Sequence, residues 1–151
     1  MDIQPFLAAS VTNIIIAQRL VRTICPYCKG RKGSVGKVTQ QYGKYFALEK
    51  VHAKLKKLSL LQANSRLADV IFYQGKGCAK CNSTGYRGRV GLYELLKVDE
   101  DLYQTILHDP SAGAIEKVAL SKGMLTMAED GLLKVFQGQT TFDEVLRVIK
   151  E

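Results

Sequence analysis

The sequence predicts an α+β protein that is mainly helical, and two features of its 151 residues indicate this fold class. Short candidate strands lie in the first two thirds of the chain, over residues 18–24, 69–73 and 89–96. From Asp99 onward, apolar residues recur with a helical period only. Hydrophobic residues at 46% and charged residues at 24% are values of a folded globular protein and exclude intrinsic disorder.

The first predicted element is a helix from Pro5 to about Ala17, followed by a strand from Gln18 to Ile24. The helix prediction rests on apolar residues at helical spacing, which are Leu7, Val11, Ile14 and Ile15. The longest unbroken apolar stretch, residues 14–17, is far shorter than the roughly 18 residues that a membrane span needs. Because Met1 and Asp2 do not form a basic leader, we expect neither a signal peptide nor a transmembrane segment.

A basic segment carries the whole formal net charge of +8, since nine basic side chains between Lys29 and Lys57 face Glu49 alone. Glycines at 33, 36 and 43 predict a loose loop at its start. A basic amphipathic helix is then predicted from Tyr45 to about Leu61, with apolar positions at Leu48, Val51, Leu55 and Leu58. The basic side chains of this segment could bind phosphates, anionic lipid or an acidic protein face. Alternatively, they could simply form a solvated helix face.

The four cysteines form two C-x-x-C pairs, Cys25 with Cys28 and Cys78 with Cys81, and 49 residues separate the pairs. Each pair can place two thiolates on a tight turn, and two such turns supply the tetrahedral sulfur set that zinc prefers. Closing a loop of this length costs little beside zinc binding, which is worth roughly 10–16 kcal/mol. The sequence therefore predicts a closed, structural zinc site with these four cysteines as its ligands.

Residues around the pairs fit such turns, because Pro26 and Gly30 flank the first pair while Gly77, Gly85 and Gly88 flank the second. Turns of this kind let backbone amides point toward sulfur. Four nearby cations are also expected to favour the thiolate form, and these are Lys29, Lys80, Arg87 and Arg89.

Two disulfides, or a redox-active C-x-x-C pair, are the alternatives to a zinc site. The lack of a secretory signal favours a reducing compartment, and therefore favours zinc over disulfides. Iron remains open as the metal, because it also suits a site made of sulfur alone.

Four helices are predicted after the last strand, each beginning at a residue that can cap its N-terminus. They run from Asp99 to about His108, from Ser111 to Gly123, and onward from Thr126 and Thr141. Both threonines are followed three residues later by glutamate, a pattern typical of the capping box. The last two helices have apolar positions suited to a small bundle core, namely Leu132, Val135, Phe136, Val145, Leu146 and Ile149.

Catalytic constellations are scarce in this sequence. It has no G-x-x-x-x-G-K-[ST] phosphate loop, and neither His52 nor His108 has a metal or nucleophile partner at a suitable spacing. We therefore predict no catalytic residue, and the chain alone is not expected to be an enzyme.

Two stretches carry a family resemblance: residues 16–28, IAQRLVRTICPYC, and residues 77–96, GCAKCNSTGYRGRVGLYELL. Both resemble the C-terminal part of the type II secretion and type IV pilus assembly ATPases. The tail over residues 122–146 resembles the closing helical subdomain of that family. Only residues 31–72, which we call the insert, depart from the pattern by being longer than the usual spacer between the cysteine pairs.

The resemblance implies a cytoplasmic homo-hexameric motor, peripheral to the inner membrane, with a RecA-like ATPase core, a tetracysteine zinc subdomain and a terminal helical subdomain. The chain would hold only the end of that plan and would be a fragment of a longer protein. Residues 1–24 would be the terminal helix and strand of the core, 25–88 the zinc-binding subdomain with its insert, 89–98 a returning strand, and 99–151 the C-terminal helical subdomain.

The same resemblance implies partners and cofactors. The partners would be the rest of the ATPase core, neighbouring subunits and inner-membrane platform proteins, with anionic lipid as a further contact. ATP and Mg²⁺ would bind only to the full-length protein, because the Walker A and Walker B motifs lie outside this chain. The zinc would be structural.

Two other functions stay open at this point. An independent zinc module could bind nucleic acid through the insert, but only Tyr42, Tyr45 and Phe46 are interleaved with its charge, so support for base stacking is thin. A zinc-knuckle chaperone or redox protein is the third hypothesis, because residues 78–85 resemble one DnaJ-type cysteine–glycine repeat. That family carries four such repeats, whereas this chain has two cysteine pairs.

Overall fold

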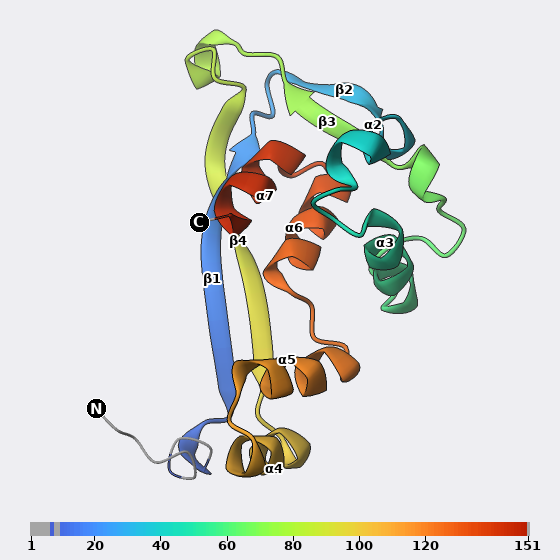
Figure 1. The fold of residues 1–151 in the computed structure, drawn as a ribbon. Coiled ribbons are helices and arrows are strands. Elements are labelled where there is room, and N and C mark those ends of the chain that lie inside the picture. Colours follow the sequence, from blue (N-terminus) through green and yellow to red (C-terminus); the bar gives the residue numbers. More distant parts are fainter. Residues whose placement is uncertain (1–6, 8–9, 151) are drawn as a thin grey trace. The chain divides into compact units, whose positions relative to one another are not determined.

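The computed structural model describes residues 7 and 10–150, and its helices and short sheets confirm the α+β class (Figure 1). The chain forms two compact units. The first unit comprises Met1–Gln18 and Tyr93–Thr126, and the second comprises Arg19–Leu92 and Met127–Glu151. Within the described part of the chain, no helix has the length and apolar character needed to cross a membrane.

Two long strands, β1 (Ile14–Ile24) and β4 (Tyr86–Lys97), pair in a two-stranded sheet, and both run through the two units. The predicted strands at 18–24 and 89–96 are confirmed, and both are longer than expected. The predicted helix ending near Ala17 is wrong over residues 14–17, which belong to β1. Three consecutive isoleucines there favour an extended backbone. Residues 5, 6, 8 and 9 of that predicted helix lie outside the described residues.

The first unit contains the helices α4 (Glu100–His108) and α5 (Ala112–Ser121). Both begin where predicted. The Asp99 carboxylate accepts a hydrogen bond from the Leu102 amide at 3.2 Å, and the Ser111 hydroxyl accepts one from the Ala114 amide at 3.3 Å. Both contacts satisfy amides that have no partner within the helix.

In the second unit, β2 (Lys29–Ser34) and β3 (Ile71–Gly75) form an antiparallel sheet with an irregularity between Arg31 and Gly33. The helix α2 (Val35–Tyr42) follows β2, and a short 3₁₀ helix, η1 (Leu67–Asp69), precedes β3. The loose loop predicted for this region is therefore wrong. The strand predicted at 69–73 exists, shifted by two residues.

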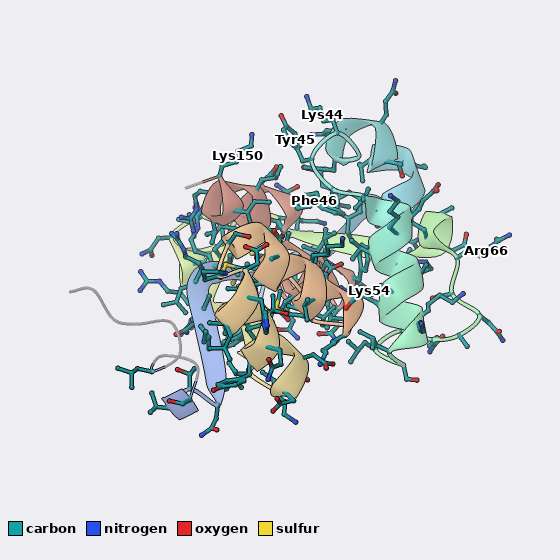
Figure 2. All side chains as sticks on the ribbon, turned by 60° about the horizontal axis from the view of Figure 1, so that its bottom comes forward. Lys44, Tyr45, Phe46, Lys54, Arg66 and Lys150 are labelled. Carbon is teal, nitrogen blue, oxygen red and sulfur yellow. The ribbon has the colours of Figure 1, made fainter. Side chains whose placement is uncertain are left out.

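The helix α3 (Leu48–Lys57) confirms the predicted basic amphipathic helix, although it is shorter than the predicted range 45–61. Leu48, Val51 and Leu55 are buried as predicted, whereas Leu58 lies beyond the helix and is 41% exposed. Lys54 on α3, which is labelled in Figure 2, forms an ion pair of 2.7 Å with Glu129. The helix is thus packed within its unit.

The last two helices, α6 (Met127–Phe136) and α7 (Phe142–Ile149), complete the second unit. The Thr141 hydroxyl accepts a hydrogen bond from the Glu144 amide at 3.3 Å, as predicted for an N-cap. The Glu144 carboxylate, however, does not complete a capping box. It accepts hydrogen bonds from the Arg22 amide at 2.9 Å and the Arg22 guanidinium at 2.6 Å, on β1.

An aromatic cluster joins the insert to α7. The Phe142 ring is 1% exposed and stacks on Tyr42 of α2 with a centroid distance of 4.4 Å. Phe72 of β3 and Phe46 lie 5.6 Å and 6.3 Å from the same ring. Residues of the insert and of the last helix therefore share one core. The predicted four-part division stays a prediction, and the helices of residues 99–151 are divided between the two units.

Candidate metal centre

Each cysteine pair lies in a sharp turn of the second unit. The first knuckle, Cys25–Cys28, connects β1 to β2, and the Cys28 amide donates to the Cys25 carbonyl at 3.3 Å. The second knuckle, Cys78–Cys81, contains the 3₁₀ helix η2 (Ala79–Cys81), in which the Cys81 amide donates to the Cys78 carbonyl at 3.1 Å. These turns place both sulfurs of a pair on one side of the backbone.

The sheet between β2 and β3 brings the two knuckles together across the intervening 49 residues. Its pairing begins with Lys29 opposite Gly75, directly next to the knuckles. The Lys76 amide then donates to the Cys28 carbonyl at 3.0 Å. The length of the insert is therefore no obstacle to a common site.

The four sulfur atoms predicted as ligands form one cluster, with every pair within 4.8 Å. The Sγ atoms of Cys25 and Cys78 are 3.9 Å apart, those of Cys28 and Cys81 are 3.8 Å apart, and those within the second knuckle are 3.7 Å apart. Zinc–sulfur bonds of about 2.3 Å in a tetrahedron require sulfurs about 3.8 Å apart. A disulfide requires about 2.05 Å. The geometry therefore suits a tetrahedral metal ion and not two disulfides.

Backbone amides stabilise the thiolate form of one cysteine in the cluster. The Cys81 sulfur accepts hydrogen bonds from the amides of Cys78 at 3.2 Å and Gly85 at 3.3 Å. Burial raises the pKa of Cys81, but these amides outweigh it and lower that pKa to about 6. Burial raises the pKa of Cys28 to about 12 against the opposing effect of the Gly77 amide. A divalent cation would stabilise the remaining thiolates.

Two of the four cations predicted to favour the thiolates, Lys29 and Arg87, contact aromatic rings in the structure. The ammonium group of Lys29 lies 4.4 Å from the centroid of the Tyr73 ring, and the guanidinium of Arg87 lies 5.3 Å from that of Tyr27. Lys29 thus contacts a ring of β3, and Arg87 contacts a ring within the first knuckle. The amides of Cys78 and Gly85, and after them the side chains of Cys78 and Cys28, lower the pKa of Cys81; Gly85 is one of the flanking glycines that the sequence singled out.

Gly85 braces the site through a close backbone approach. Its carbonyl accepts a hydrogen bond from the Cys25 amide at 2.9 Å, which links the two knuckles. Its φ is +78°, and a Cβ atom there would lie 2.7 Å from the carbonyl oxygen of Gly75. The sequence indicated a turn at Gly85 but gave no sign of Gly75 as its partner, because that contact depends on the sheet register.

Both histidines belong to the part of the chain that the structure describes, and neither is a member of the cysteine cluster. His52 is buried, its Nε2 atom lies 3.2 Å from the Ser65 hydroxyl, and burial together with Lys56 lowers its pKa. His108 is exposed at the end of α4 and contacts the Gln104 carbonyl. Neither histidine lies with a carboxylate or nucleophile in an arrangement that indicates catalysis.

Comparisons with known proteins bear on the family of the chain. The family model described as "Type II/IV secretion system protein" matches residues 1–147. The chain is 36% identical over 146 residues to the type IV pilus assembly ATPase PilB of Thermus thermophilus, covering 97% of this chain and 14% of that protein. It is 38% identical over 151 residues to the type II secretion system ATPase E of Vibrio cholerae, covering 100% of this chain and 26% of that protein.

The chain therefore spans only about a seventh to a quarter of the length of these two relatives. The family model, in contrast, covers both knuckles, the insert and nearly all of α7. On that match, the chain belongs to the type II/IV secretion system protein family.

Proposed function

We propose that the chain is the C-terminal, zinc-binding part of a hexameric ATPase that powers type II secretion or type IV pilus assembly. One observation carries this proposal: the chain matches the family throughout, and its two cysteine pairs converge at spacings that suit zinc. ATP and Mg²⁺ would bind in a part of the protein outside these residues. The protein would work in the cytoplasm, at the inner membrane.

The bound zinc would act as a structural clamp. Cys25 directly follows β1, and β4 begins five residues after Cys81, so both long strands lead to the metal site. With four thiolate ligands, the ion would have no open position for substrate or water. It would hold the second unit to the two strands, so that movement of the ATPase core could be passed through them to inner-membrane platform proteins.

The aromatic residues of the insert argue against the nucleic-acid hypothesis. Tyr42 and Phe46 are buried around Phe142, so their rings are unavailable for base stacking. Tyr45 is exposed, and the ammonium groups of Lys44 and Lys150 lie 4.9 Å and 4.2 Å from its ring centroid (Figure 2). A single exposed ring gives little support for the stacking of successive bases.

The proposal is tested in the full-length protein that contains this sequence. Replacing Cys25 and Cys78 by serine is expected to remove zinc and abolish secretion or pilus assembly, while the ATPase core still binds nucleotide. Asn82→Gly, directly after the second knuckle, is the matched control and should retain zinc and function. Normal export by a protein that has lost its zinc would contradict the proposed role of the clamp.

A second measurement addresses catalysis. The purified 151-residue chain is expected to carry one zinc ion and to show no Mg²⁺-dependent ATP hydrolysis, whereas the full-length protein hydrolyses ATP. Hydrolysis by the purified chain would overturn the assignment of ATP binding to another part of the protein. Metal-free, folded protein with two disulfides would overturn the zinc assignment.

A further inference from the structure

The turn between α6 and α7 forms hydrogen bonds with the last residues of β1, directly before the first knuckle. We call residues 139–141 of this turn the strap. The Ile24 amide donates to the Gln139 carbonyl at 2.9 Å, and the Thr140 hydroxyl donates to the Arg22 carbonyl at 2.8 Å. The strap therefore satisfies backbone groups of a strand from the other end of the sequence.

These contacts occupy the edge of β1 that faces away from β4. Backbone groups of alternate residues in a strand point to opposite edges, so the amides of Arg22 and Ile24 share one edge. The Arg22 amide donates to the carboxylate of Glu144, in the first turn of α7, at 2.9 Å. On the opposite edge, the Cys25 amide donates to the Gly85 carbonyl, directly before β4, at 2.9 Å. The end of β1 is thus held along both edges.

Buried side chains make the bonds on the α7 side, since Thr140 and Glu144 are both buried. The guanidinium of Arg22 donates to the Glu144 carboxylate at 2.6 Å and lies 4.3 Å from the centroid of the Tyr86 ring. The Tyr86 hydroxyl lies 2.9 Å from the hydroxyl of Thr141. Tyr86 is the first residue of β4, so both strands that lead to the metal site are joined to the strap.

We propose that Thr140 and Glu144 are positioning residues, which fix the end of β1 to α7 so that the strand and the last helix move together. The inference rests on the proposed function, in which movement of the ATPase core reaches the second unit through β1 and β4. Zinc would join the two knuckles to each other, whereas the strap joins β1 to α7 without using a metal ligand. When the strap opens, β1 can shift against α7, and ATP hydrolysis no longer drives export.

Hydrogen exchange in the purified, zinc-bound chain tests the positioning. Thr140→Val keeps the shape of the side chain but removes its hydroxyl. It should speed exchange of the Ile24 amide by about tenfold, the effect of losing one hydrogen bond of the strap. Exchange of the Cys25 amide, on the other edge of β1, should change by less than about twofold. Thr140→Ser keeps the hydroxyl and should keep slow exchange at Ile24.

Tyr42→Phe is the matched control for stability. It removes a different hydrogen bond to α7, which the Tyr42 hydroxyl donates to the Asp143 carboxylate at 2.9 Å. It should leave the ratio of the Ile24 and Cys25 exchange rates unchanged. If Thr140→Val accelerates both amides equally, the hydroxyl serves only general stability, and the inference is overturned.

The full-length protein tests the coupling. Thr140→Val combined with Glu144→Gln removes the hydroxyl and the charge that hold Arg22. The double variant should retain its zinc and its kcat for ATP hydrolysis but lose most of its secretion or pilus assembly, whereas Thr140→Ser and Tyr42→Phe should retain export.

Two results would overturn the coupling: normal export by the double variant, or loss of its ATP hydrolysis in step with export. If the double variant does not fold, Thr140→Val alone decides by the same split between kcat and export. Failure of the proposed function is a separate result, because it appears as normal export by the zinc-free Cys25→Ser and Cys78→Ser protein.

Discussion

The two knuckles and the insert lie in the same compact unit but are stabilised over different distances along the sequence. Within each knuckle, the defining hydrogen bonds join residues three or four positions apart, such as the Gly85 amide and the Cys81 sulfur. The insert depends instead on Phe142, which lies 100 residues beyond Tyr42 and stacks on it. Local chemistry therefore shapes the knuckles, whereas the insert takes its form from the last helix.

The largest expected effect comes from removing a predicted metal ligand. We expect Cys78→Ser to abolish zinc binding and to unfold the second unit, because structural zinc contributes roughly 10–16 kcal/mol of apparent binding free energy. Metal content and thermal unfolding of the purified chain measure both outcomes. A chelator should reproduce the effect in the unsubstituted chain.

The exposed Asn82, directly after the second knuckle, provides a matched control. Its φ of 49° suits glycine, so Asn82→Gly should keep both the zinc and the unfolding temperature. If Cys78→Ser also keeps the unfolding temperature, the metal site does not stabilise the second unit. The proposed difference between the knuckles and the insert would then be wrong.

Removing the central ring of the aromatic cluster should have the next largest effect. Phe142→Ala is expected to lower the free energy of unfolding by about 4 kcal/mol, because it leaves a cavity among three aromatic neighbours. The zinc should remain bound in the fraction that stays folded, since the knuckles form their own hydrogen bonds. Urea denaturation and metal analysis give the two values. Loss of zinc from the folded fraction of Phe142→Ala would show that the knuckles depend on the packing of the insert.

Acid should weaken a third link, between α7 and β1. Glu144 is 3% exposed; burial raises its pKa, but Arg22 and Arg147 outweigh burial and lower the pKa to about 2. A lowered pKa in the folded state stabilises the fold above pH of about 4.5, and this stabilisation is lost as the pH falls toward 2. Because both arginines are about half exposed and water screens them, we expect Glu144→Gln to cost about 2 kcal/mol at neutral pH.

The measurement compares urea unfolding of the unsubstituted chain and Glu144→Gln at pH 7, 4 and 3. The difference between their free energies of unfolding should shrink as the pH falls. Metal content is measured at each pH, and only pH values at which both proteins keep their metal enter the comparison. Glu116→Gln, at an exposed position of α5, should show no such pH dependence. A difference that stays constant would rule out the ion pairs as its source.

The features that the sequence predicted well depend on short-range patterns. The cysteine pairs, the Asp99 and Ser111 caps and the buried face of α3 each follow from residues within a few positions of one another. The convergence of the two knuckles was also predictable, because a tetrahedral sulfur site needs four ligands and the chain has four cysteines.

The glycines of the insert led to the wrong prediction of a loop at its start. Gly36 was interpreted as part of a loop, but it lies in α2, where a Cβ atom would be 3.1 Å from the Cα of Ala68. The glycine permits close packing of the helix on η1, and nothing near it in the sequence reveals that contact. The isoleucines of β1 were assigned to a helix for a similar reason. Their spacing fits a helix, whereas the strand that pairs with β1 is β4, about 70 residues away in the sequence.

A single hydrogen bond between the insert and α7 gives a smaller expected effect. The Tyr42 hydroxyl donates to the Asp143 carboxylate at 2.9 Å, and burial followed by this contact raises the pKa of Tyr42 to about 12. Tyr42→Phe keeps the stacked ring and should cost about 1 kcal/mol. Tyr45→Phe, at an exposed ring, should be close to neutral in the same urea measurement. Equal costs for the two variants would mean that the hydroxyl of Tyr42 adds nothing.

The smallest expected effect is a gain in stability at the turn that ends α3, where the Ser59 amide donates to the Lys56 carbonyl and the Leu60 amide donates to the Leu55 carbonyl. Ser59 has a φ of 58°, a left-handed conformation that glycine adopts without strain, and it occupies the position where a Schellman turn usually carries glycine. Ser59→Gly should raise the free energy of unfolding by about 0.5 kcal/mol, since relief of strain exceeds the extra entropy of the unfolded chain. Ser83, with a φ of 59° beside the second knuckle, allows the same substitution there. If local contacts dominate the knuckle, Ser83→Gly should raise the unfolding temperature of zinc-bound protein less than Ser59→Gly does. A larger gain at Ser83 would place more strain in the knuckle than in the insert, which would reverse the contrast between the two regions.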